Sequence, residues 1–167
     1  ATDMYNVAVG HNAGRDVTTG KEHTLIGGLA GDALTSGDRN VAIGTNALSA
    51  DTQGSRNVAV GYDSLKTQNF TTGTNAYNVG VGYNTGAAIT TGIQNSILGA
   101  ESGSSLTTGD SNVAFGYQSL RDDTLGSHSV ALGDRALKFQ NFTTATDTYN
   151  TAVGSSAGLN ITTGTAN

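Results

Sequence analysis

Histidines are the first residues to examine for chemistry, because imidazole serves as a general acid or base and as a metal ligand near neutral pH. The chain has three of them, His11, His23 and His128. No Ser–His–Asp arrangement and no paired carboxylates of the kind that hydrolysis needs stand out in the sequence. The chain also has no cysteine, which excludes disulfides and thiolate metal sites. We therefore predict no catalytic residues, no cofactor, no metal and no enzymatic activity.

Tyrosines and asparagines suggest binding or modification instead. Tyr62, Tyr83 and Tyr117 each follow a recurring glycine and could form an edge that contacts a ligand such as a cell-surface glycan or receptor. The alternative is that they are simply packing aromatics. Three Asn-x-Thr sequences have the form of a glycosylation acceptor, although such short matches arise readily in a chain rich in Asn and Thr. They begin at Asn69, Asn141 and Asn160.

A recurring glycine defines the units that must position all of these residues. Each copy closes a short motif, mostly of the form Asn-x-Ala-(Ile/Val/Leu/Phe)-Gly, and the steps between copies run 17, 17, 17 and 21, a series that occurs twice. The glycines are Gly10, Gly27, Gly44, Gly61, Gly82, Gly99, Gly116, Gly133 and Gly154. A fixed short period is typical of stacked architectures, in which each unit buries its apolar side against its neighbours.

The unit predicts two short strands and two turns. We number each unit from the residue that begins the motif, so that the first unit is 6–22 and the glycine is its fifth residue. The motif has the β-branched residues of a strand, and a second strand is expected in Thr-rich segments such as 18–20 and 90–92. Helical periodicity is missing, and the chain has no Asn-Gly or Asp-Gly hairpin signal. We therefore predict an all-β, parallel β-solenoid of about nine coils, one for each short or long unit.

Alternation along the strand predicts which side chains face inward. The second and fourth positions lie on one side, and because the fourth is large and apolar in every unit we assign that side to the interior. The third position then faces outward and is apolar or small throughout, which favours coverage by another chain. The predicted oligomer interface is Ala8, Leu25, Ala42, Ala59, Ile97, Ala114 and Ala131.

The ninth and twelfth positions of the unit compensate each other. Where the ninth residue is glycine, as at Gly31, the twelfth is aliphatic, as at Leu34. Where the ninth is leucine, as at Leu48, the twelfth is polar, as at Asp51. Since protein interiors are close-packed, we predict that these two positions share one core pocket. The pattern recurs after every fourth unit, so that 1–167 is one repeat domain with super-repeats 6–77 and 78–149 and a partial third, 150–167.

Charge and hydropathy restrict the possible partners. The net charge is −5, and the eight Lys and Arg residues are scattered singly, so we expect no nucleic-acid partner. No long apolar run is present, and we expect no membrane insertion. The chain begins in a way that resembles the end of a long unit, and we interpret it as a segment of a longer array.

Asn57-Val58-Ala59-Val60-Gly61 and its companions resemble the Asn-Ser-Val-Ala-Ile-Gly head repeats of trimeric autotransporter adhesins. The shorter unit of this chain, as in 40–48, resembles repeats of phage and algal-virus tail-fibre-like proteins. The adhesin repeat is shorter than either unit of this chain, which is a departure. The resemblance covers essentially the whole chain and implies a left-handed β-roll that forms a homotrimer.

We therefore expect a non-enzymatic structural or adhesive segment of an extracellular, cell-surface or virion fibre, with possible end-to-end stacking. The alternative is an ice- or crystal-surface-binding solenoid, because threonines recur at one position of the unit. They are Thr18, Thr35, Thr52, Thr90, Thr107 and Thr124.

Overall fold

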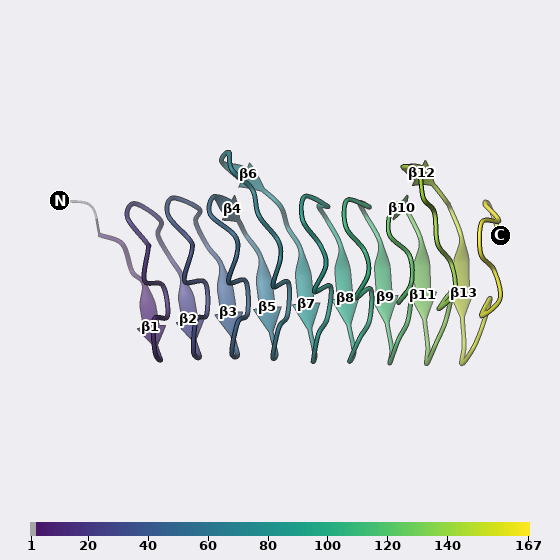
Figure 1. Ribbon diagram of the computed structural model, residues 1–167, viewed down its shortest axis with the longest axis horizontal. Coiled ribbons are helices and arrows are strands. Elements are labelled where there is room, and N and C mark those ends of the chain that lie inside the picture. Colours follow the sequence, from purple (N-terminus) through teal and green to yellow (C-terminus); the bar gives the residue numbers. More distant parts are fainter. Residues whose placement is uncertain (1–2) are drawn as a thin grey trace.

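The computed structural model describes residues 3–167 and contains no helix in this range. Nine parallel strands are stacked side by side along the long axis of the molecule (Figure 1). They are β1 (Val7–Val9), β2 (Thr24–Ile26), β3 (Val41–Ile43), β5 (Val58–Val60), β7 (Val79–Val81), β8 (Ser96–Leu98), β9 (Val113–Phe115), β11 (Val130–Leu132) and β13 (Thr151–Val153). This arrangement confirms the predicted parallel β-solenoid of about nine turns.

The sheet pairs each strand with the same position of the next unit. Val41 is the partner of Val58 and Ala42 is the partner of Ala59, and the register continues in this way from β1 to β13. Equivalent residues of successive coils therefore form columns along the stack. At about 4.8 Å per step between strands, the nine strands span roughly 38 Å.

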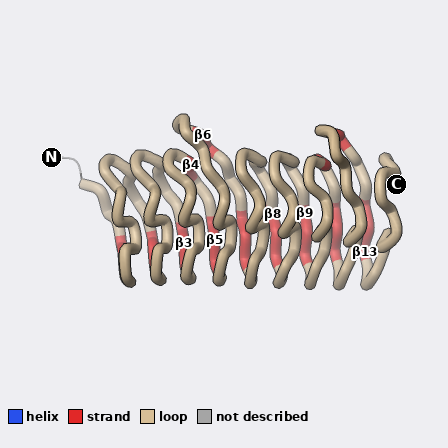
Figure 2. Tube along the Cα trace, viewed as in Figure 1, coloured by secondary structure: helices blue, strands red, loops and turns tan. Residues whose placement is uncertain are grey.

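Only one side of each coil is a regular strand, and the remainder is turns and loops (Figure 2). The expected second strand is absent from the Thr-rich segments 18–20 and 90–92, so this part of the prediction is wrong. In the part of the chain that the structure describes, short second strands occur only around the long units, where β4 (Gly54–Ser55) pairs with β6 (Thr74–Asn75) and β10 (Gly126–Ser127) pairs with β12 (Thr146–Asp147). The segments containing β6 and β12 project from the same side of the stack (Figure 1).

The fifth-position glycine is required by both its conformation and its neighbour. Gly10 has φ of 130°, a region that side-chain-bearing residues rarely adopt. A Cβ atom there would lie 2.5 Å from the carbonyl oxygen of Gly27 in the next coil. The column of glycines thus lets successive turns approach one another directly. A second glycine column, which includes Gly37, lacks the unusual φ but faces the next coil equally closely.

The third position lies inside the coil, so the predicted orientation of the strand is inverted. Leu25, Ala42, Ala59, Ile97, Ala114 and Ala131 are buried by the chain's own coils, whereas Ala8 in the first coil is exposed. The six buried residues belong to the core and do not form an intermolecular surface. The interior is narrow, which explains why the third position is mostly alanine.

The core fills the space that glycines leave. A Cβ atom on Gly31 would lie 2.8 Å from both Leu25 Cδ2 and Leu34 Cδ1, and one on Gly103 would lie 2.9 Å from Ile97 Cδ1. The ninth and twelfth positions therefore face one interior, as predicted. Leu25 and Ile97 also fill this interior, although they were predicted to face outward as part of the oligomer interface.

The polar residues at the twelfth position are buried in hydrogen-bonded networks. Asp51 Oδ2 accepts a 2.6 Å bond from Gln68 Nε2, and Gln68 Oε1 accepts a 2.8 Å bond from Asn78 Nδ2. Asp51 Oδ1 accepts the backbone N–H groups of Gly54 and Phe70, each at 3.0 Å. The second super-repeat has the same network, in which Gln140 donates to Asp123 at 2.6 Å.

First-position asparagines form a ladder along the stack. Asn95 Oδ1 accepts the backbone N–H of Asn112 at 3.0 Å, and Asn95 Nδ2 donates to the carbonyl of Gly109 at 2.9 Å. Related contacts recur along the solenoid from Asn6 to Asn167, with His23 and Ser129 in place of asparagine in two units. A buried polar side chain thus links neighbouring coils at a position where a backbone group needs a partner.

Candidate functional site

The side of the nine-stranded sheet that points away from the core carries the second and fourth positions of all nine units. We call this surface the outer face. Its residues are Val7, Val9, Thr24, Ile26, Val41, Ile43, Val58, Val60, Val79, Val81, Ser96, Leu98, Val113, Phe115, Val130, Leu132, Thr151 and Val153. None of them is charged, and even the larger apolar ones remain partly exposed, with Phe115 at 40%. The apolar surface available to another molecule is therefore this face and not the predicted alanine column.

Sequence reasoning missed the outer face because both sides of the strand are apolar. Two signals could have identified it. Thr24 and Ser96 show that the second position tolerates polar side chains, which a narrow core would not accept without a partner. Gly80 at the third position shows the opposite restriction, since a Cβ atom there would lie 3.0 Å from Leu65 Cγ in the core.

Two columns of largely exposed side chains border the outer face. The leading-edge column precedes each strand and consists of Tyr5, Glu22, Arg39, Arg56, Tyr77, Gln94, Ser111, His128 and Tyr149. All nine residues have φ between 51° and 62°, so the chain bends sharply just before each strand. The trailing-edge column follows the fifth-position glycine and consists of His11, Gly28, Thr45, Tyr62, Tyr83, Ala100, Tyr117, Asp134 and Ser155.

The predicted ligand tyrosines lie on the trailing edge, but only two of them meet. The rings of Tyr62 and Tyr83 stack with centroids 5.6 Å apart, and both are about half exposed, at 49% and 55%. Tyr117 is separated from Tyr83 by the coil that carries Ala100. Its hydroxyl instead accepts a 3.0 Å bond from Gln118. The structure thus gives this edge an exposed aromatic pair and a single tyrosine.

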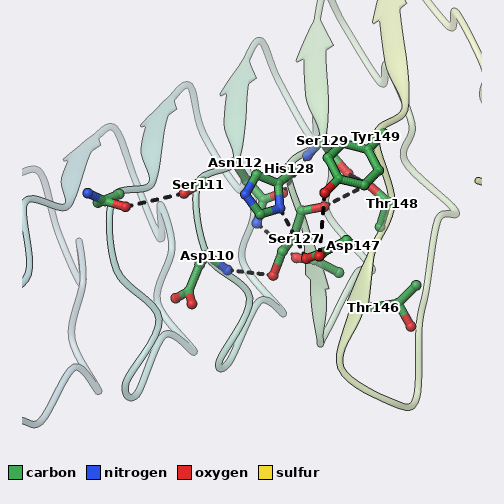
Figure 3. Close-up of polar contacts among 12 residues, drawn as sticks. Asp110, Ser111, Asn112, Ser127, His128, Ser129, Thr146, Asp147, Thr148 and Tyr149 are labelled. Atoms are coloured by element: carbon green, nitrogen blue, oxygen red, sulfur yellow. Dashed lines mark hydrogen bonds and ion pairs between the residues drawn. The ribbon is translucent and has the colours of Figure 1, made fainter. Parts of the chain in front are cut away.

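The leading edge carries two related clusters, one in each super-repeat. His128 stacks on Tyr149 with ring centroids 5.3 Å apart, and its Nδ1 lies 3.1 Å from Asp147 Oδ1 (Figure 3). At the equivalent place in the first super-repeat, the guanidinium of Arg56 lies 5.7 Å from the ring centre of Tyr77 and donates to Asn75. A planar basic group therefore covers one side of a tyrosine at equivalent points of the stack.

The His128 cluster does not assemble a hydrolytic triad. Ser127 Oγ accepts the backbone N–H of Asp110 at 3.0 Å and points away from the imidazole (Figure 3). Ser129 is buried and bonds to Thr148 at 2.6 Å. The pair His128–Asp147 thus has no adjacent serine hydroxyl in position to act as a nucleophile.

Two buried titratable groups have shifted pKa values. Burial lowers the pKa of His23, and the backbone of Gly37 and the charge of Asp38 offset part of this shift. Burial raises the pKa of Asp51, while bonds from Phe70 N–H and Gln68 oppose the shift. His23 lies in the first-position ladder and Asp51 in the network with Gln68, so both pKa shifts reflect burial in the structural interior.

The predicted glycosylation residues are all exposed. Asn69, Asn141 and Asn160 lie on the surface, and the first two accept hydrogen bonds from Thr52 and Thr124 at 3.1 and 3.0 Å. Their side-chain oxygens thus help to hold the long coils, while the asparagines remain accessible.

The threonine column has a structural role within the chain. Thr35 Oγ1 donates to the carbonyl of Thr52 at 3.0 Å, and Thr107 Oγ1 donates to that of Thr124 at 2.9 Å. The hydrogen bonds that these hydroxyl groups donate link one coil to the next. This arrangement favours a stacking role for the column over the alternative of an ice-binding surface.

Within residues 3–167, no pocket and no cluster of metal-ligating side chains is present. The same range contains no helix long and apolar enough to cross a membrane. Comparisons of the chain with protein-family models, curated proteins and solved structures give no match.

Proposed function

We propose that this chain is a non-enzymatic building segment of an extracellular or virion fibre, and that it self-associates through its outer face as a homotrimer. The observation that carries this proposal is the lack of any charge along the whole outer face, in a chain whose sequence has 8 basic and 13 acidic side chains elsewhere. Large exposed apolar patches on soluble proteins mark interaction surfaces.

A second copy of the chain is the partner that fits this surface best. The outer face repeats once per coil, and every coil presents a large apolar side chain there at its fourth position. A binding surface that matches such a regular array must have the same period, and another copy of the same solenoid has it. Closed cyclic assemblies are the common result of such self-complementarity, and the resemblance to trimeric adhesin heads supports three subunits.

The fibre role follows from the repeated construction. A stack of near-equivalent coils supplies length, and an oligomer of such stacks adds stiffness. The sides of the stack away from the outer face also recur in every coil, so weak contacts with a glycan or receptor there would combine through effective concentration. These properties suit a segment that holds a binding tip away from a surface or adheres along its flank.

The test is the molecular mass in solution, measured by light scattering at micromolar concentration. We expect a trimer for the unaltered chain, and a monomer for Val60→Lys and Val113→Lys, because each lysine would place a charge in a dry interface. The matched control is Thr108→Lys, on the exposed side away from the outer face, which should remain trimeric. Circular dichroism would show that all variants keep the fold. A monomeric mass for the unaltered chain would contradict the proposal.

A further inference from the structure

Neighbouring subunits of the assembly must also meet at the borders of their outer faces. We propose that the leading-edge column of one subunit lies against the trailing-edge column of the next at the same level, so that Arg56 meets Tyr62, Tyr77 meets Tyr83 and His128 meets Asp134 of the neighbouring copy. This inference rests on the proposed self-association and specifies which side chains meet between subunits.

The direction of the strands produces this pairing. All nine strands are parallel and run across the stack axis (Figure 1). Suppose that the copies surround a symmetry axis parallel to the stack and that each outer face points toward this axis. The strands of all copies then run in the same rotational direction around the axis. The end of each strand then points toward the beginning of a strand in the next subunit. The trailing edge of one copy therefore borders the leading edge of its neighbour.

Closed symmetry also sets the level. A cyclic assembly relates its subunits by rotation without translation, so residues of equivalent coils lie at equal heights. Within every coil the trailing-edge residue is six positions after the leading-edge residue. The partners are therefore residues n and n+6 of different subunits, which gives Arg56 with Tyr62 and Gln94 with Ala100.

The chemistry of the resulting pairs is compatible at every level. Arg56 would meet the half-exposed ring of Tyr62, which suits a cation–π contact, and Tyr77 would meet Tyr83 in an aromatic pair. Among the nine levels no leading-edge charge faces a like charge, since Glu22 would meet Gly28 and Arg39 would meet Thr45.

The level of His128 brings an imidazole and a carboxylate together. His128 is paired with Asp147 within its own chain, and Asp134 is paired with Arg135 at 2.9 Å. Across the boundary, the imidazole of one subunit would approach the Asp134 carboxylate of the next. The order Asp147, His128, Asp134, Arg135 then alternates acidic and basic groups along the contact.

Engineered disulfides test the pairing directly, because the chain has no cysteine of its own. The double variant Gln94→Cys/Ala100→Cys places thiols on both edges of one coil. About 13 Å of extended chain between Asn95 and Gly99 separates them within a subunit, beyond the roughly 7 Å Cα separation that a disulfide tolerates. Ser111→Cys/Tyr117→Cys repeats the test one coil further along.

We expect oxidation of either level-matched variant to shift the band from the monomer to a covalent trimer on a denaturing gel. Each single variant should remain a monomer on that gel. The control Gln94→Cys/Asp134→Cys, whose thiols differ in level by two coils, should also remain unlinked.

Two measurements separate failure of the pairing from failure of the proposed function. A trimeric mass under reducing conditions, with no link at either matched level or an equal link in the off-level control, would overturn the edge pairing and leave self-association intact. Links that stop at a covalent dimer would also overturn it. A monomeric mass for the reduced protein would overturn the self-association itself.

Discussion

His23 is the one buried side chain in residues 3–167 with a polar atom that lacks a hydrogen-bond partner. It occupies the first position of its unit, where the corresponding residue of the next super-repeat is Asn95. His23 Nδ1 accepts the backbone N–H of Asn40 at 3.2 Å, which leaves the proton on Nε2. In the other super-repeat, the Asn95 amide donates to Gly109 at 2.9 Å. The histidine therefore keeps the backbone bond of the ladder, whereas its Nε2 lies near the Gly37 backbone without a hydrogen bond of normal geometry.

We expect His23→Asn to raise the free energy of unfolding by about 1 kcal/mol, because it replaces an unsatisfied buried donor with an amide that bonds to Gly37. Urea unfolding monitored by circular dichroism measures this change. The conservative control is Asn95→His, which should lower stability by a similar amount. Equal stability of His23→Asn and the unaltered chain would contradict the assignment.

The same substitution has a pH signature. The pKa of His23 is lowered in the folded state, so below about pH 6.5 the unfolded chain binds a proton that the folded chain does not. Its contribution to stability is therefore complete above that pH and declines as the pH falls toward the folded-state pKa. We expect His23→Asn to remove this decline. The gain in stability should thus be larger at pH 5 than at pH 8.

At the scale of the coil, the ninth position determines both the turn and the core. Leu48, Leu65, Leu120 and Leu137 are fully buried, although their φ values of 49° to 54° lie in the left-handed region. This conformation costs a side-chain-bearing residue about 1 kcal/mol or more. The other units place glycine here and fill the space from elsewhere. In the units with leucine at the ninth position, burial of the leucine side chain thus offsets the strained backbone.

Substitution at Leu48 separates the two effects. Leu48→Ala should lower the free energy of unfolding by about 2–5 kcal/mol, because it leaves a cavity and keeps the strained φ. Leu48→Gly removes the same packing but relieves the backbone. We therefore expect the glycine variant to be more stable than the alanine variant, which is the reverse of the order at an ordinary strand or helix position. Denaturant midpoints would show the order, and a less stable glycine variant would refute the argument.

These coil-level features show what the sequence could predict. The regular steps between the fifth-position glycines predicted the parallel solenoid and its columns, because a fixed period leaves only one register. The compensation of Gly31 by Leu34 predicted their shared pocket. Alternation could not decide between the two sides of the strand, since alanine on one side and valine on the other are both apolar. The narrow interior, where leucines already occupy the space, places Ala42 inside and Val41 outside.

Other features escaped prediction because they depend on contacts between coils. Asn57 and Ala76 of one long unit are replaced by Ser129 and Thr148 in the next. Ser129 and Thr148 bond to each other, so a smaller residue at one site accompanies a larger one at the other. Residues so far apart in the chain reveal this exchange only once the coil is folded.

At the scale of the whole molecule, the buried hydrogen-bonded networks repeat once for each set of four coils. The Asp51–Gln68–Asn78 network spans three successive units, and its copy spans Asp123, Gln140 and Asn150. Any coil moved out of this order leaves buried polar groups without partners. The array should therefore accept the gain or loss of a whole super-repeat more readily than the gain or loss of a single coil.

Two internal deletions test this unit. Removal of 78–149 joins Tyr77 to Asn150 and preserves every network contact, whereas removal of 78–128 takes fewer coils but separates Gln140 from Asp123 and Gln68 from Asn78. We expect the shorter deletion to be the less stable protein by about 2 kcal/mol or more, since it leaves buried amides unpaired. Thermal unfolding of both chains measures the difference, and greater stability of the 78–128 deletion would refute the four-coil unit.

The direction of the strands also has a mechanical consequence. The hydrogen bonds between coils point along the stack, so a pull on the two ends of a single chain loads the bonds of one coil boundary at a time. Each coil that opens lengthens the chain by its own extended length, roughly 56–76 Å. Tension on one chain would then be relieved by the opening of one coil at a time, and in the proposed trimer the contacts between subunits would hold the remaining coils in place. A fibre of the proposed kind would therefore extend in small increments before it breaks.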